Sequence, residues 1–145
     1  MRFALLASVL YPLVLTSCTA APDPNPTATE LAVGSSPELG RYLTDLSGRA
    51  VYALPAELAE GCDDACAAQW PPVPGGKIPG EPKEPAIQQE LIGVLERSSG
   101  PQLSYGGQAL HYRGRTEATD PPERSVKDEW GTWSLLFPHG ERMVP

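Results

Sequence analysis

The sequence predicts a mainly β protein with a small helical content. Short runs of β-type residues recur along the chain, turn residues separate them, and two pairs of runs flank turns that contain glycine. The chain has 145 residues, which suits one domain with a single core once a leader is removed. We therefore expect two related β-hairpin repeats packed into one small domain, with one short helix near Cys62–Trp70.

Residues 1–17 have the features of a bacterial lipoprotein signal peptide. Arg2 provides a cationic start, an apolar run follows, and Leu15-Thr16-Ser17 precedes Cys18 in the order of a lipobox. The run is shorter than the roughly 20 residues of a membrane-spanning helix. We expect Cys18 to carry a diacylglycerol that anchors the protein to the cell membrane or outer membrane, facing the periplasm or exterior. An ordinary secretory signal with an incidental cysteine is the alternative.

Residues 18–37 are expected to form a tether. Four prolines lie among Ala, Thr and Ser in this segment, at Pro22, Pro24, Pro26 and Pro37. Such a composition buries too little apolar surface to offset the entropy of an ordered chain. At ~3.1 Å per residue in polyproline geometry, the tether would hold the body up to roughly 60 Å from the bilayer. The β-rich domain is then expected over residues 38–145.

The first two predicted hairpins join residues 41–44 to 50–54 and residues 102–105 to 108–112. Ser47-Gly48 marks the first turn, and Gly106-Gly107 marks the second more strongly, because paired glycines suit the positive φ angles of tight hairpin turns.

Three further segments complete the predicted β-rich domain. Residues 91–97 favour a strand, although Gln88, Gln89 and Glu90 leave a helix over 86–95 as an alternative. The apolar residues from Trp133 to Phe137 are expected to form a last strand. The proline-rich segment 71–85 is excluded from central strands and helix interiors, so we expect a loop there.

The segment from Cys62 to Trp70 predicts a short helix, capped by Asp63 or Asp64. Residues four apart lie on one helix face, at a Cα separation that a disulfide accepts. If Cys18 carries lipid, Cys62 and Cys66 can pair with no thiol left over in an oxidising compartment. The alternative is a redox pair or a copper site, because soft sulfur ligands select Cu(I), with His111 as a third ligand.

An internal repeat runs through the predicted domain. The segment Gly48–Tyr52 returns as Gly107–His111, and each copy leads through a polar loop to a tryptophan, at Trp70 and Trp133. Leu39-Gly40 and Ile92-Gly93 stand before the two copies and extend the alignment. The repeats therefore span about residues 39–74 and 91–139. We expect the two hairpins to pack pseudo-symmetrically, with the tryptophans sealing the joint.

Over about residues 39–139 the chain resembles bacterial predicted lipoproteins described as a secreted repeat of unknown function. The segment Cys62-x3-Cys66-Ala67-Ala68-x-Trp70-Pro71-Pro72 is similar to that family's Cys, three residues, Cys-Ala and Trp-Pro-Pro block. The family's repeat is marked by tyrosine, any residue, an aromatic, two residues and aspartate. The positions that correspond to that motif here are Tyr52, Leu54 and Glu57 in the first copy and His111, Arg113 and Thr116 in the second, with Tyr112 shifted by one. Only Tyr52 keeps the family residue. We interpret Tyr42, Tyr52, Tyr105 and Tyr112 as packing groups, because aromatics dominate small β cores. The alternative is a binding motif that this member has lost or changed.

Composition narrows the expected function. The net charge is −7, and removal of Arg2 with the leader leaves 10 basic and 18 acidic side chains, a net charge of −8. Such a surface disfavours nucleic acid, which is bound by clustered Lys and Arg. The chain has no Gly-x-Ser-x-Gly motif and only two histidines, and acid pairs such as Asp128-Glu129 are typical of solvated loops.

We therefore expect a non-catalytic, lipid-anchored envelope protein with an accessory or interaction role and no cofactor besides its acyl lipid. Its membrane contact would come through the lipid, and its protein partner and oligomeric state stay open. A redox or copper-handling lipoprotein that uses Cys62, Cys66 and His111 is the alternative.

Overall fold

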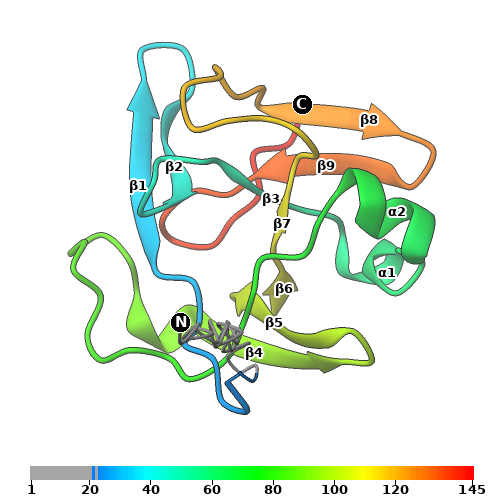
Figure 1. The fold of residues 1–145 in the computed structure, drawn as a ribbon. Coiled ribbons are helices and arrows are strands. Elements are labelled where there is room, and N and C mark those ends of the chain that lie inside the picture. Colours follow the sequence, from blue (N-terminus) through cyan, green and yellow to red (C-terminus); the bar gives the residue numbers. More distant parts are fainter. Residues whose placement is uncertain (1–20, 22) are drawn as a thin grey trace, which may run out of the picture.

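The computed structural model describes residue 21 and residues 23–145, so the predicted signal peptide and Cys18 lie outside the described residues. The described part is mainly β, which confirms the predicted fold class (Figure 1). Its elements are β1 (Leu31–Ser36), β2 (Gly40–Asp45), β3 (Val51–Ala53), α1 (Ala56–Ala59), α2 (Asp64–Gln69), η1 (Gln89–Leu91), β4 (Ile92–Arg97), β5 (Gly100–Tyr105), β6 (Gln108–Ala109), β7 (His111–Tyr112), β8 (Ser125–Asp128) and β9 (Gly131–Leu135). No helix in this part of the chain is long and apolar enough to cross a bilayer.

The strands form three small sheets. β1 pairs with β2, the order β4-β5-β6 makes a second sheet, and the order β7-β3-β9-β8 makes the third. Adjacent strands in all three are antiparallel. In Figure 1 the two helices lie on the side of the molecule away from the β1–β2 hairpin.

The ordered body begins earlier than the sequence predicted. Residues up to 37 were expected to be tether, but β1 lies inside that segment and Leu31 is 2% exposed. Before it, the amide of Ala28 donates to the carbonyl of Lys77 at 3.0 Å, and Lys77 donates to Pro26 at 2.9 Å. Composition was misleading because the four prolines lie outside β1, which itself carries apolar residues that enter the core.

We expect Gly76→Ala to release this N-terminal segment. Gly76 has φ +141°, and a Cβ there would lie 2.0 Å from the carbonyl oxygen of Pro26. Backbone strain of about 1–3 kcal/mol corresponds to roughly 5- to 150-fold more frequent opening. Limited trypsin digestion should therefore cleave faster after Lys77. Gly80→Ala is the matched control, because a Cβ at Gly80 meets nothing within 4 Å.

The first predicted hairpin is wrong in its pairing. β2 forms a six-pair ladder with β1, and towards β3 it makes only the bridge between Thr44 and Ala50. The reason is that the other edge of β2 is taken by the C-terminal segment, since the amide of Leu43 donates to the carbonyl of Leu136 at 3.0 Å. The turn itself exists, and Gly48 has φ +90° within it.

The later elements follow the prediction more closely. β5 and β6 form a hairpin around Gly106-Gly107, both of which have positive φ. The predicted strand at 91–97 is β4, and the helical alternative is reduced to the single turn η1. The last strand is β9, a little earlier than expected, and the proline-rich segment is an ordered loop. Helix α1 and strand β8 were not predicted.

The first half of the domain contains β1 to α2 and the second half contains β4 to β9. Their contacts follow a pseudo-two-fold arrangement, in which a segment of each half bonds to a strand of the other. β2 of the first half bonds to Leu136 of the second, and β5 of the second half bonds through the Leu103 amide to the carbonyl of Val73 in the first, at 2.9 Å. Between them β3 and β7 pair antiparallel, with Tyr52 directly opposite His111. Each half of the chain therefore hydrogen-bonds to the hairpin of the other half.

The structure moves the start of the first repeat from residue 39 to residue 31. The β1–β2 hairpin and the β4–β5 hairpin each contain six residue pairs, which places Leu31 opposite Ile92 in the alignment of the halves. Leu39-Gly40 corresponds to Ser99-Gly100 and not to Ile92-Gly93. The sequence alignment matched Leu39-Gly40 to Ile92-Gly93 because each is an apolar residue followed by glycine. The strand pairing shows that the two dipeptides lie at different positions of their hairpins.

Candidate functional site

An open cleft lies between the α1–α2 segment on one side and the β4–β5 turn on the other. It encloses about 1180 Å³, part of it open to solvent. Its lining residues come from α1 and the start of α2, from the β4–β5 turn, and from β5 and β7: Ala59, Glu60, Cys62, Asp63, Asp64, Ala67, Pro72, Glu96, Arg97, Ser98, Ser99, Gln102 and His111.

A chain of hydrogen bonds forms the floor of this cleft. Gln102 and His111 are buried, at 4% and 6% exposure. The side-chain nitrogen of Gln102, Nε2, donates to the carbonyl of Leu110 at 2.9 Å and lies 3.0 Å from His111 Nε2. The side-chain oxygen of Gln102, Oε1, accepts from Arg97 Nε at 3.3 Å. The amide of Gln102 therefore links the guanidinium of Arg97 to the imidazole of His111.

His111 is held as one neutral tautomer. Its Nδ1 lies 2.8 Å from the carbonyl oxygen of Trp70, which only accepts, so Nδ1 carries the proton and Nε2 accepts from Gln102. Burial lowers the pKa of His111, and the charge of Arg97 lowers it further against the opposing hydrogen bond to Trp70. Both ring nitrogens are therefore engaged.

Because the folded pKa of His111 lies below the value near 6.5 of the unfolded chain, we expect acid to weaken the fold. Below pH ~6.5 the unfolded chain binds a proton that the folded protein excludes, so stability falls with pH until the folded pKa is reached. Urea unfolding should show a loss of up to about 1.4 kcal/mol between pH 7.5 and 5.5. The loss should shrink in His111→Gln and persist in His139→Gln, which removes the exposed histidine.

The wall of the cleft contains the disulfide. Cys62 and Cys66 are bonded, with a Cα separation of 5.0 Å, as the sequence predicted. Asp63 is the N-cap of α2, and its carboxylate accepts from the Cys66 amide at 3.0 Å, so the predicted helix and cap are also confirmed. Cys66 is fully buried, whereas Cys62 is partly exposed and lines the cleft.

The three residues of the copper hypothesis are only partly brought together. Cys62 and His111 line one cleft, although 49 positions separate them in the sequence. In this structure the sulfur atoms are in the disulfide and the His111 nitrogens are hydrogen-bonded. Within the described residues no group of three or more His, Cys, Asp or Glu side chains is placed to hold a metal ion.

The two tryptophans of the repeat stack behind the cleft. The rings of Trp70 and Trp133 lie 4.3 Å apart between centroids and 10° from parallel. Tyr52 packs edge-on against Trp70 at 5.4 Å, and His111 packs edge-on against Trp133 at 4.9 Å, both at 71°. The contact of Tyr52 with Trp70 thus matches that of His111 with Trp133, as the pseudo-two-fold relation requires. The stacked tryptophans pack at the interface between the two halves, as expected from the sequence.

Asp128 binds both tryptophans, a role that the sequence did not reveal. Its carboxylate accepts from the indole nitrogen of Trp70 at 2.7 Å and from that of Trp133 at 3.2 Å. The interpretation of Asp128 as solvated loop charge is therefore wrong, because the β8–β9 hairpin turns it inward onto the stacked pair. No local signal distinguishes it from its exposed neighbour Glu129.

The remaining repeat positions divide between packing and solvent. Tyr52 is 2% exposed and Tyr112 is 8% exposed. The hydroxyl of Tyr112 donates to Asp45 at 2.9 Å, and its ring packs under the guanidinium of Arg49. Burial, and then the Asp45 carboxylate, raise the pKa of Tyr112. Glu57, in the place of the family's aspartate, is exposed on α1.

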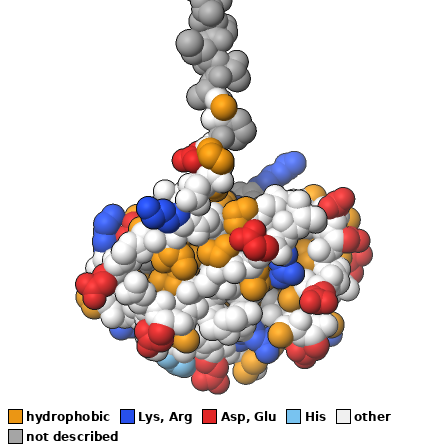
Figure 2. All heavy atoms as spheres, turned by 90° about the horizontal axis from the view of Figure 1, so that it is seen from below, with side chains coloured by type: hydrophobic (Ala, Val, Ile, Leu, Met, Phe, Trp, Pro, Cys, Tyr) orange, Lys and Arg blue, Asp and Glu red, His pale blue; other side chains and the backbone are white. Residues whose placement is uncertain are grey.

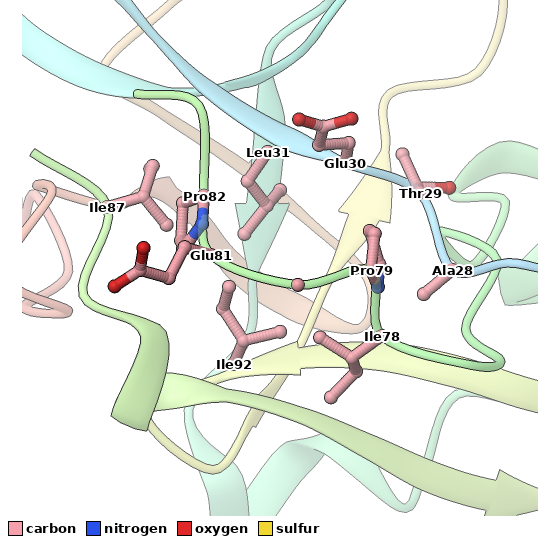
Figure 3. Close-up of a pocket in the computed structure, with 11 residues that line it drawn as sticks. Ala28, Thr29, Glu30, Leu31, Ile78, Pro79, Glu81, Pro82, Ile87 and Ile92 are labelled. Atoms are coloured by element: carbon pink, nitrogen blue, oxygen red, sulfur yellow. The ribbon is translucent and has the colours of Figure 1, made fainter. Parts of the chain in front are cut away.

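A second hollow lies under the proline-rich loop at the starts of β1 and β4 (Figure 3). It encloses about 330 Å³, including space open to solvent, and apolar side chains such as Leu31, Ile78, Ile87 and Ile92 line much of it. The carboxylate of Glu30 pairs with Lys83 of this loop at 3.2 Å. The hollow is smaller and less polar than the cleft at His111.

Comparison of the chain with protein-family models, with curated proteins and with solved structures found no match. The resemblance to the secreted-repeat lipoproteins therefore stays a prediction from the sequence.

Proposed function

We propose that the protein is a lipid-anchored, non-catalytic binding protein of the bacterial cell envelope. The sequence Leu15-Thr16-Ser17-Cys18 supports the anchor, although it lies outside the described residues. The Cys62–Trp70 block and the duplicated hairpins support membership of the secreted-repeat lipoproteins.

The observation that carries the proposal is the spacing between Cys18 and the first residues tied to the body. Ala28 is 5% exposed and is hydrogen-bonded to Lys77. Eight residues, 18–25, precede Pro26, whose carbonyl accepts from the Lys77 amide, and at ~3.1 Å per residue they would reach at most about 25 Å. A lipid on Cys18 would therefore hold the body close to the bilayer, where it can bind a partner at the surface.

The state of the histidines supports a binding role over catalysis. A general base needs a ring nitrogen within reach of a substrate proton. Both nitrogens of His111 are occupied by Trp70 and Gln102, while His139 is exposed and lies next to Glu141. His111 therefore holds the floor of the cleft in a fixed arrangement, which suits a binding role better than proton transfer.

The anchor is tested by mass spectrometry of the protein purified from bacterial membranes. We expect an N-terminal peptide that begins at Cys18 and carries a diacylglycerol. Cys18→Ala should abolish both the lipid and membrane retention, whereas Cys62→Ser should leave them intact. An N-terminus elsewhere without lipid would contradict the proposal.

The redox or copper-handling role is a second candidate, because Cys62 and His111 line one cleft. Cys66 is buried, which opposes formation of its thiolate during exchange. Reduced protein that binds one Cu(I) and loses it in His111→Gln would favour this role.

We expect Cys62→Ser to lower stability without affecting export. Removing a disulfide that closes so short a loop should cost less than the ~3 kcal/mol of a 15-residue loop. Thermal unfolding under oxidising conditions measures the effect, and the wild type with added reductant should show a similar decrease. Unchanged melting together with loss of a bound metal would count against the structural role of the disulfide.

A further inference from the structure

The chain enters the ordered body beside the proline-rich loop. The amide of Lys77 donates to the carbonyl of Pro26 at 2.9 Å, and the amide of Ala28 donates to the carbonyl of Lys77 at 3.0 Å. Residues 26–31 and 77–84 therefore share one face of the molecule, which we call the anchor face. In Figure 1 the segment before β1 lies at the lower left.

A tether of this length limits which face of the body can meet a membrane. The eight residues 18–25 span at most about 25 Å at ~3.1 Å per residue. A domain of this length is roughly 35 Å across, from the radius of gyration that is usual for its size. Turning the opposite face to the bilayer would raise Pro26 beyond the reach of the tether. A lipid on Cys18 therefore excludes the opposite face and favours the anchor face.

The anchor face has an apolar surface beside the tether. Ile78, Pro79 and Pro82 are each partly exposed, and together with Ile92 of β4 they line the hollow of Figure 3. Figure 2 shows hydrophobic side chains exposed around the point where the N-terminal segment joins the body. Apolar side chains that leave water at the boundary of headgroups and acyl chains stabilise a membrane-bound orientation.

The charges of the anchor face are balanced, unlike those of the rest of the chain. Arg41 belongs to this face through its ion pair with Glu84, at 3.6 Å. The acidic side chains of the face are then matched by an equal number of basic ones: Glu30, Glu81 and Glu84 with Lys77, Lys83 and Arg41. The net charge of −8 expected for the mature chain therefore lies elsewhere. Repulsion from anionic headgroups is weakest at the anchor face.

We propose that the anchor face lies on the lipid bilayer that carries the anchor, with the tip of the proline-rich loop at the level of the headgroups. The apolar side chains of the loop contact the acyl boundary, and Lys77 and Lys83 contact the headgroups. This inference rests on the lipid at Cys18 in the proposed function, and it adds a fixed orientation of the body. The β8–β9 turn, on the opposite side of the molecule in Figure 1, then faces away from the membrane.

The test is a fluorescence measurement on the lipidated protein in vesicles of equal parts phosphatidylcholine and phosphatidylglycerol. Gly80→Cys places a nitrobenzoxadiazole label at the loop tip, where a Cβ meets nothing within 4 Å. Glu129→Cys places the same label on the exposed β8–β9 turn as a control. Since Cys62 and Cys66 are bonded to each other and the lipid occupies Cys18, only the introduced cysteine reacts.

We expect the emission of the label at position 80 to shift to shorter wavelength. Spin-labelled lipids should quench it at least about threefold more strongly than the label at position 129. Equal quenching at both positions, or none at position 80, would overturn the proposal. A wavelength shift at position 80 without quenching by the lipids would identify a second copy of the chain on this face, and would overturn it as well.

Matched variants separate the anchor face from general attraction to the vesicles. With the label at position 80, Lys77→Glu with Ile78→Asp should lower the ratio of docked to undocked protein at least about fivefold, since a lysine near an anionic surface contributes about 1 kcal/mol. Lys127→Glu with Leu58→Asp makes the same changes at exposed positions outside the face and should change the ratio less than about twofold. Equal effects of the two pairs would contradict the proposal.

Circular dichroism checks that these variants fold. If either pair fails to fold, the single substitutions Lys77→Glu and Lys127→Glu decide the question, because both side chains are exposed.

Mass spectrometry of the same preparation separates this proposal from the anchor itself. Protein without a diacylglycerol on Cys18 would overturn both proposals, because the reach of the tether matters only when the lipid is present. Lipidated protein whose label at position 80 behaves like the label at position 129 would overturn the orientation alone and leave the anchor standing.

Discussion

Trp133→Ala is expected to lower the free energy of unfolding by about 3–5 kcal/mol. Trp133 is fully buried, stacks on Trp70 at 4.3 Å, and contacts His111 edge-on at 4.9 Å. Truncation leaves a cavity at the joint where the two halves meet, and it removes the partner of Trp70. Since a domain of this size has a stability of roughly 5–15 kcal/mol, the loss is a large fraction of the total and should clearly lower the urea midpoint.

Urea unfolding followed by circular dichroism measures this effect without relying on tryptophan fluorescence. Trp130→Ala is the matched control, because Trp130 only borders the same cluster and should cost less than half as much. A double-mutant cycle with Trp70→Ala should show strong non-additivity, since the second truncation removes a contact that is already lost. Additive effects would mean that the stacked pair does not join the two halves.

Asp128→Ala is the second large effect, with an expected loss of roughly 2–5 kcal/mol. One carboxylate accepts from both indole nitrogens, and each buried donor left without a partner costs about 1–3 kcal/mol. The Trp130 amide, which donates to the same carboxylate at 3.0 Å, also loses its acceptor. Chemical unfolding at pH 7 checks the loss.

The neighbouring Glu129→Ala is the control for this substitution, because Glu129 is exposed and should change stability by less than about 0.5 kcal/mol. Asp128→Asn keeps one acceptor oxygen and should fall between the wild type and the alanine variant. If Asp128→Ala proved as mild as Glu129→Ala, the indole contacts would contribute little and water would be their effective partner.

Local sequence signals predicted the features that depend on neighbours in the chain. The helix capped by Asp63, the pairing of Cys62 with Cys66, and the turn at Gly106-Gly107 all arise within a few residues, where backbone preference and capping act directly. The first hairpin failed because its outcome depended on a competing segment, Leu136, far away in the chain. Which segment pairs with a strand edge over such distances depends on which other segments can bond to the same edge.

The candidate site was predicted only in part. Cys62 and His111 were singled out from the sequence, whereas Arg97 and Gln102 were not. An internal signal existed, since Gln102 lies at the position that Tyr42 holds in the first half, but it becomes visible only when the hairpins are aligned by their strand pairing. The sequence alignment was shifted there, so the polar replacement could not be recognised.

By itself, the sequence determined the β-rich class, the presence of two related halves, the helix with its disulfide, and the expectation of a lipid on Cys18. Only the tertiary structure decided that the halves interlock, that Asp128 joins the two indoles, and that Gln102 and His111 meet at an open cleft. The physical reason is the range of the interactions. Turns and caps are stabilised by adjacent residues. A strand edge that bonds to the other half, or a buried polar pair, is stabilised only once distant segments have packed together.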